Sequence, residues 1–168
     1  MDIPVFVSCP TSLSADQNAS RALVLRQLKR FNLEARALGR SDYPTELPLR
    51  EVLLLARHCS GGVILGFEQY RSTAGIRRPG TDGEAAHDNA VPFPTPWNNL
   101  EAGILYGLRL PLLIFKEAGI EGGVFDPGVT DVFIHGMPTS SDNAARREGL
   151  SDVFLKWQAD VRAHYYGD

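Results

Sequence analysis

Short apolar segments alternate with longer amphipathic segments along the 168 residues, and this alternation constrains the fold most. The short segments are rich in Val, Ile, Leu and Phe, which is typical of buried strands, and the longer ones repeat apolar residues at helical spacing. We expect strands at Ile3–Ser8, 34–38, 63–67, 110–115 and 131–135, and helices within 11–33, at 49–58, from 97 onward and at 150–165. This order predicts a single α/β domain over 1–168, a three-layer sandwich whose mostly parallel sheet of about five strands has helices on both faces.

Charge and composition exclude several classes of function. The formal net charge is -3 and there is no run of Lys or Arg, so DNA is not an expected partner. The first ten residues lack the basic and apolar parts of a signal peptide, and the apolar runs are too short to span a membrane. Neither the 2 Cys nor the 4 His show metal-ligand spacing. We therefore expect a cytoplasmic protein without a metal site.

A long segment at 68–96 is rich in Gly, Pro and charged residues and has no clear periodicity. We expect a loop there, because such composition interrupts regular structure. A loop of this length inside a compact domain is usually functional.

Small and polar residues gather where the expected strands end. In parallel sheets ligands bind beyond the carboxyl ends of the strands, so these segments should converge. The candidate contacts are Ser8, Cys9, Pro10, Tyr70, Trp97 and Asn98. Glu101 follows Trp97 by four residues, so both side chains lie on one face of the expected helix.

This set of residues suits cleavage of an N-glycosidic bond. The sequence has no G-x-G-x-x-G, no G-x-x-x-x-G-K-[ST] and no G-x-S-x-G, so phosphate loops and a hydrolase nucleophile elbow are absent. A carboxylate such as Glu101 can stabilise or capture the sugar cation that forms, and an aromatic ring such as Trp97 can stack on the base. A nicotinamide leaving group already carries positive charge, so it needs no strong general acid.

Two motifs resemble TIR domains that cleave NAD. V-F-V-S, ending at Ser8, is similar to their first strand, and W-x-x-x-E from Trp97 to Glu101 is similar to the helix that carries their catalytic Glu. The resemblance implies a flavodoxin-like or TIR-like sheet, with Glu101 as the catalytic residue and Trp97 against nicotinamide. It also implies that the loop with Tyr43 and Leu47 closes over the substrate.

The resemblance further implies an NAD glycohydrolase or ADP-ribosyl cyclase, with NAD as the substrate and no cofactor. It implies a role in bacterial anti-phage defence and work as a homo-oligomer or with a partner effector protein. The chain departs from TIR domains in its segment at 68–96 and in the Gly-rich run after Phe115.

A second resemblance leads to an alternative function. Nucleoside 2-deoxyribosyltransferases have a similar core, and Cys9-Pro10, Glu101-Ala102-Gly103 and Leu110-Pro111 look like their pattern. The chain lacks their D-x-G-T stretch directly before the Glu. Both families cleave a bond between a ribosyl group and a base through a Glu at this position. A third alternative is a non-catalytic TIR-like module that senses a nucleotide or assembles with a partner.

Each candidate residue also has a plain structural interpretation. Glu101 could be a carboxylate near a helix start, stabilised only by the helix dipole. Trp97 could be a hydrophobic plug under the long segment, and Asn98 could cap the helix rather than contact ribose or phosphate. Ser8 and Cys9 could be ordinary residues at a strand end.

Overall fold

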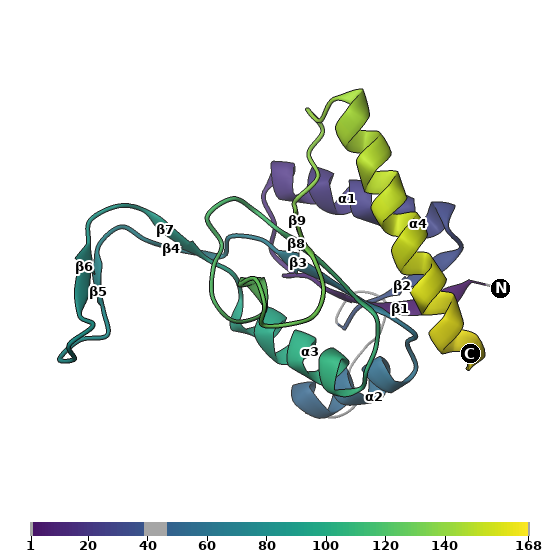
Figure 1. Ribbon diagram of the computed structural model, residues 1–168, viewed down its shortest axis with the longest axis horizontal. Coiled ribbons are helices and arrows are strands. Elements are labelled where there is room, and N and C mark those ends of the chain that lie inside the picture. The colour runs from purple at the N-terminus through teal and green to yellow at the C-terminus, as the bar shows by residue number, and fades with distance from the viewer. Residues whose placement is uncertain (1, 39–46, 168) are drawn as a thin grey trace.

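The computed structural model describes residues 2–38 and 47–167, and in this part of the chain a sheet of 5 strands has the order β2-β1-β3-β8-β9 (Figure 1). All neighbouring strands in it run parallel. The strands are β1 (Ile3–Ser8), β2 (Leu33–Arg36), β3 (Gly62–Gly66), β8 (Leu112–Lys116) and β9 (Ile134–Gly136). The predicted parallel sheet is confirmed, and β9 lies at one edge of it.

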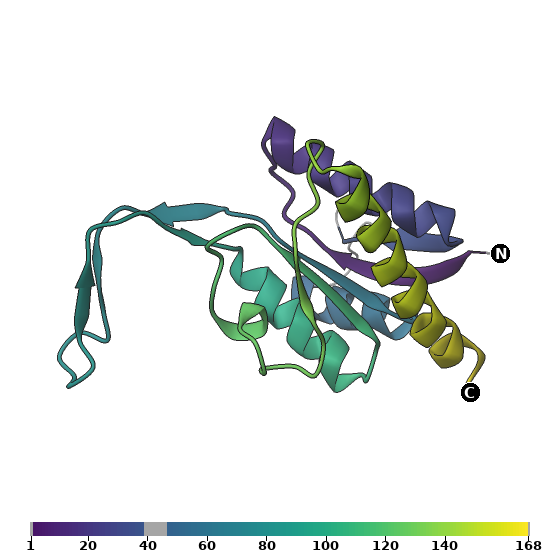
Figure 2. The ribbon, with the colours of Figure 1, turned by 45° about the horizontal axis from the view of Figure 1, so that its top comes forward.

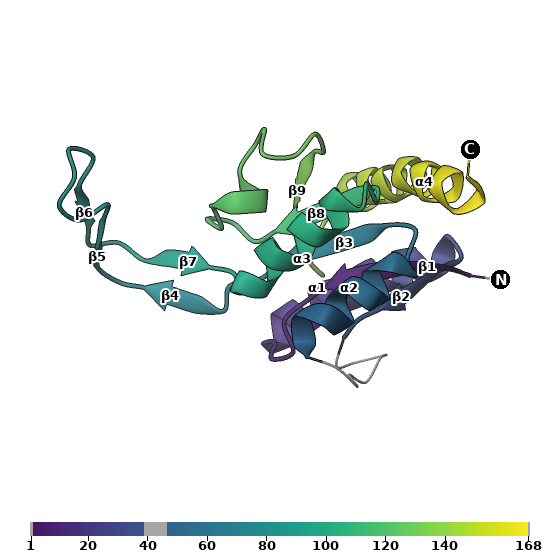
Figure 3. The same ribbon diagram turned by 90° about the horizontal axis from the view of Figure 1, so that it is seen from below.

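Helices cover both faces of this sheet. Those in the described residues are α1 (Ala15–Arg30), α2 (Pro48–Arg57), α3 (Pro96–Gly107) and α4 (Ala144–Tyr166). Alternate side chains of β1 point to opposite faces: Val5 and Val7 pack with α1 and α4, whereas Phe6 packs with α2 and α3 (Figures 1 and 3). The predicted three-layer sandwich is therefore confirmed.

Helix α4 begins six residues before the predicted start at residue 150. The Asn143 side chain caps it by accepting a hydrogen bond from Arg146 N at 2.9 Å, and the first turns are largely exposed, so they show no apolar periodicity. Its predicted apolar stripe is confirmed, because Phe154, Trp157 and Val161 are buried against the sheet. Within the described residues, no helix is both long and apolar enough to cross a bilayer.

The segment predicted as a loop at 68–96 contains two antiparallel ladders that extend away from the body (Figures 1 and 2). Its strands are β4 (Tyr70–Ser72), β5 (Gly75–Arg77), β6 (Ala85–His87) and β7 (Val91–Phe93). We call residues 70–93 the arm. β4 pairs with β7 and β5 pairs with β6. The expectation of a loop was wrong, because most arm side chains are exposed on both faces and so carry no alternation of apolar and polar residues.

Candidate active site at the carboxyl edge of the sheet

The candidate site lies where β1 ends against the start of α3. Ser8 is the last residue of β1 and is buried on the side of the sheet that α3 covers. Thr95 caps α3, with its side chain accepting from Trp97 N, and Pro96 occupies the first turn. The sequence therefore folds α3 so that its first turns meet the strand end, as the rule for parallel sheets predicts.

Glu101 lies deeper in α3 than the sequence suggested. The helix begins at Pro96, so Glu101 belongs to its second turn, and the first turn contains no acidic residue. The favourable interaction of a carboxylate with the helix dipole declines beyond the first turn. The dipole alone therefore gives a weak reason for a carboxylate at this position.

Asn98, Ser8 and Glu101 form one hydrogen-bonded chain. The fully buried Asn98 donates from Nδ2 to Ser8 Oγ at 2.7 Å. The Ser8 hydroxyl uses its own proton in the hydrogen bond to the Glu101 carboxylate. Asn98 does not cap α3, because Thr95 does. Asn98 Oδ1 is also buried, and it accepts no hydrogen bond from the described residues.

Burial raises the pKa of Glu101 to about 7, and the hydrogen bond from Ser8 opposes this shift. No cation contributes to the shift, and in the described part of the chain no Lys or Arg forms an ion pair with Glu101. A buried carboxylate without a counter-cation is costly when ionised. A site of this kind is complementary to positive charge brought by a ligand.

The sequence did not predict the contact between α3 and the connection that follows β8. Asn99 Oδ1 accepts from Val124 N at 2.9 Å, which attaches η1 (Gly123–Phe125) to α3. A Cβ on Gly123, whose φ is 59°, would lie 2.1 Å from Asn99 Oδ1. Glycine is therefore required at 123 for this close approach. The Gly-rich run after Phe115 was the only sequence signal for this contact.

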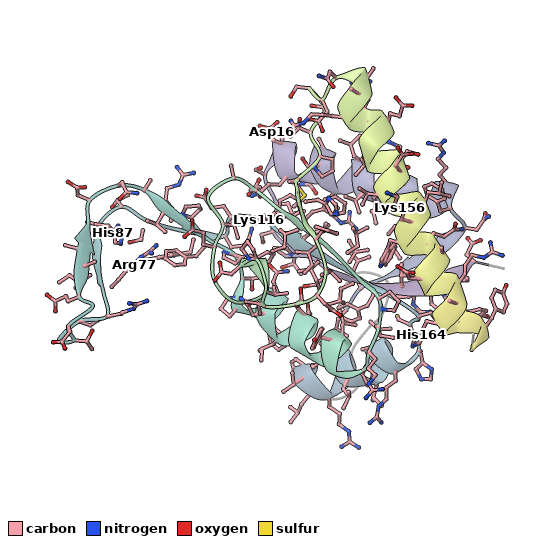
Figure 4. The ribbon with its side chains drawn as sticks, viewed as in Figure 1. Asp16, Arg77, His87, Lys116, Lys156 and His164 are labelled. Carbon is pink, nitrogen blue, oxygen red and sulfur yellow. The ribbon has the colours of Figure 1, made fainter. Side chains whose placement is uncertain are left out.

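Lys116, at the end of β8, also holds this connection in place (Figure 4). Its Nζ donates to the carbonyl oxygens of Ile120 at 2.7 Å and Phe125 at 3.0 Å. Gly66, paired with Lys116 in the sheet, leaves room for the Phe125 ring, because a Cβ there would lie 2.5 Å from it. These contacts close the connection between β8 and η1 over the strand ends.

Glu117 is a second carboxylate at this edge, but it has a structural role. It accepts from Glu68 N at 2.6 Å and from Gln17 Nε2 at 3.1 Å. It therefore ties the base of the arm and α1 to the end of β8. Its Oε2 is engaged with these two neutral donors, so Glu117 stabilises the frame of the site.

Three predicted contacts are sequence neighbours of these residues. Cys9 and Pro10 follow Ser8, and Trp97 precedes Asn98. Cys9 is half-buried, and its Sγ donates to the Pro10 carbonyl oxygen at 3.5 Å. Trp97 is 40% exposed, so it is not the fully buried plug of its plain interpretation, and ring surface remains free for a ligand.

Two other predicted contacts, Leu47 and Tyr70, lie outside this hydrogen-bonded chain. Leu47 is the N-cap of α2 and is 79% exposed. Tyr70 starts the arm, where its ring lies 6.2 Å from the Phe93 ring, between centroids. Tyr43 lies outside the described residues.

In residues 2–38 and 47–167 no group of three or more His, Cys, Asp or Glu side chains could hold a metal ion. Comparison with family models, curated proteins and solved structures finds no match to this chain.

Proposed function

We propose that this protein cleaves the bond between nicotinamide and ribose in NAD, as a glycohydrolase or cyclase, with Glu101 as the catalytic carboxylate. One observation carries the proposal: Glu101 is largely buried, no basic side chain in the described residues pairs with it, and Ser8 holds its carboxylate by a hydrogen bond. A sugar cation in the transition state would stabilise such a carboxylate more than any described group near it in the free protein does.

Cleavage of NAD develops positive charge on the ribose, and Glu101 lacks a cationic partner in the free protein. The bond from ribose C1′ to the nicotinamide nitrogen breaks, and its electron pair leaves with nicotinamide, which becomes neutral. Positive charge then moves onto the ribose, where the ionised Glu101 stabilises or captures it. Water attack on C1′, with loss of a proton, gives ADP-ribose, and attack by an adenine nitrogen of the same molecule gives a cyclic product.

Trp97 would orient the nucleotide beside Glu101, whereas the fully buried Asn98 would act through Ser8, whose hydroxyl it holds. The exposed ring surface of Trp97 can stack on the nicotinamide ring. Ser8 acts as a positioning residue, because it fixes the Glu101 carboxylate and is itself held by Asn98.

The pKa of Glu101 also supports a second candidate, a nucleoside N-glycosidase or 2-deoxyribosyltransferase. A neutral base must gain a proton as it leaves, and a carboxyl group with a pKa of about 7 remains half protonated near neutral pH. In that reaction a single carboxyl group would have to serve both the base and the sugar. NAD needs only the ionised form, so it remains the preferred substrate.

A product analysis would separate these functions. The protein, at high concentration, is incubated with NAD and with a panel of nucleosides and deoxynucleotides, and the products are identified by liquid chromatography and mass spectrometry. We expect nicotinamide from NAD, and the mass of the second product distinguishes hydrolysis from cyclisation. Release of a free base from a nucleoside with NAD untouched would replace our proposal by the second candidate. Binding of NAD without any turnover would indicate a nucleotide-sensing module.

A further inference from the structure

A cleft of about 510 Å³ lies between the arm and the connection that follows β8. Arm residues on its walls include Tyr70, Arg77, His87 and Phe93, and the facing connection contributes Glu121 and Asp126. Figure 4 shows Arg77 and His87 on the arm, with Arg77 directed towards the body. A volume of this size is typical of small-ligand sites.

Arg77 supplies a free cation to this cleft. Among the described residues its guanidinium group forms no ion pair and no hydrogen bond, whereas Arg71 is paired with Glu68. On the opposite wall Asp126 Oδ1 accepts from Gly122 N at 2.8 Å. The cleft therefore offers a guanidinium group for an anion on one side and carboxylates for hydrogen-bond donors on the other.

His87 adds a hydrogen-bond acceptor of fixed direction. Its Nδ1 lies 3.2 Å from the Asn89 carbonyl oxygen, and because a carbonyl can only accept, Nδ1 carries the proton. In that tautomer Nε2 is the acceptor. It lies over Gly75, where a Cβ would approach it to 2.7 Å. Glycine at 75 therefore leaves room for the His87 ring on the neighbouring strand.

Exposed aromatic surface completes the cleft. Tyr70 and Phe93 form a tilted pair with centroids 6.2 Å apart, and they are 68% and 40% exposed. Two neighbouring exposed rings can hold a planar base by stacking. An anion site, directed acceptors and an aromatic surface are together the features that recognise a phosphorylated nucleoside.

We propose that this cleft binds a nucleoside 5′-phosphate, with the phosphate on Arg77, the base on the Tyr70–Phe93 pair and ribose or amino donors facing His87 and Glu121. The arm leaves the end of β3 and returns to the start of α3, the helix that carries Glu101. On the proposed function, with NAD as the substrate, the cleft binds the adenosine phosphate half of NAD.

Arg77→Ala tests the cleft by binding and by kinetics. By calorimetry we expect wild type to bind 5′-AMP, and Arg77→Ala to bind it at least about tenfold more weakly, because a charge-assisted hydrogen bond is lost. With NAD we expect KM to rise by about the same factor while kcat is unchanged. Nicotinamide riboside, which lacks the phosphate, should react equally with both proteins. Arg77→Lys should retain part of the affinity.

The matched control is Arg26→Ala, which removes an exposed cation from α1 on the other face of the sheet. Thermal unfolding of each variant checks that the fold is retained. If wild type does not bind 5′-AMP, or if Arg77→Ala binds it equally well, the cleft proposal is overturned even when NAD is cleaved. Binding of 5′-AMP that depends on Arg77, together with no cleavage of NAD, would support the cleft and overturn the proposed function.

Discussion

Replacing Glu101 by Gln should make the protein more stable at pH 8, by about 3 kcal/mol in the free energy of unfolding. Burial raises the pKa of Glu101 from its ordinary value of 4.5 to about 7 in the folded protein. The folded state thus binds a proton more tightly than the unfolded state. The stability that this provides is complete below pH 4.5 and is lost as the pH rises to 7, where the buried carboxylate becomes ionised.

Gln has nearly the same shape and no charge, so it avoids the loss above pH 7. For a chain of this length the melting temperature at pH 8 should rise by roughly 6–12 °C, and the two proteins should melt alike near pH 4. Calorimetry at both pH values measures this. Glu148→Gln, at an exposed position of α4, is the control and should change neither value. If Glu101→Gln is no more stable than wild type at pH 8, burial of the ionised carboxylate does not reduce the free energy of unfolding.

The second large effect is expected in the pH dependence of NAD cleavage. If the ionised form of Glu101 acts on the sugar cation, kcat/KM should rise about tenfold for each pH unit below 7 and level off above it. Between pH 5 and pH 8 this amounts to a change of roughly a hundredfold. Initial rates of nicotinamide release at low NAD concentration measure the profile. A rate that falls as the pH rises through 7 would instead assign Glu101 the role of a general acid.

Ser8→Ala separates positioning from catalysis in the same experiment. It removes the hydrogen bond that favours the ionised carboxylate, so the midpoint of the profile should move to higher pH. It also leaves the buried Asn98 Nδ2 without its acceptor, which should cost about 1–3 kcal/mol of stability. A lower rate with an unchanged midpoint would mean that Ser8 does not act through Glu101.

The sequence was informative where burial imposes a pattern. β1 was predicted with its observed bounds, Ile3–Ser8, because its apolar run is bounded by polar residues and Pro10. The stripe of Phe154, Trp157 and Val161 likewise follows from helical spacing against the core. Where side chains are exposed the pattern is lost, so both the arm and the first turns of α4 were missed.

The candidate site was only partly accessible from the sequence. Its edge follows from the rule for parallel sheets, and Glu101 follows from its spacing to Trp97. The hydrogen bond from Asn98 to Ser8 joins residues 90 positions apart and has no local signal. The contact of Asn99 with Val124 likewise depends on how the connection after β8 folds back, which only the structure shows.

The role of Glu101 is tested most directly by nicotinamide release from NAD at pH 8, compared between wild type and Glu101→Gln with Glu148→Gln as the matched control. Calorimetry first establishes whether all three proteins bind NAD. We expect wild type and Glu148→Gln to release nicotinamide at the same rate and Glu101→Gln to be slower by at least about 10³-fold with binding retained. Equal release by Glu101→Gln, or binding of NAD with no release by wild type, would contradict Glu101 as the catalytic carboxylate.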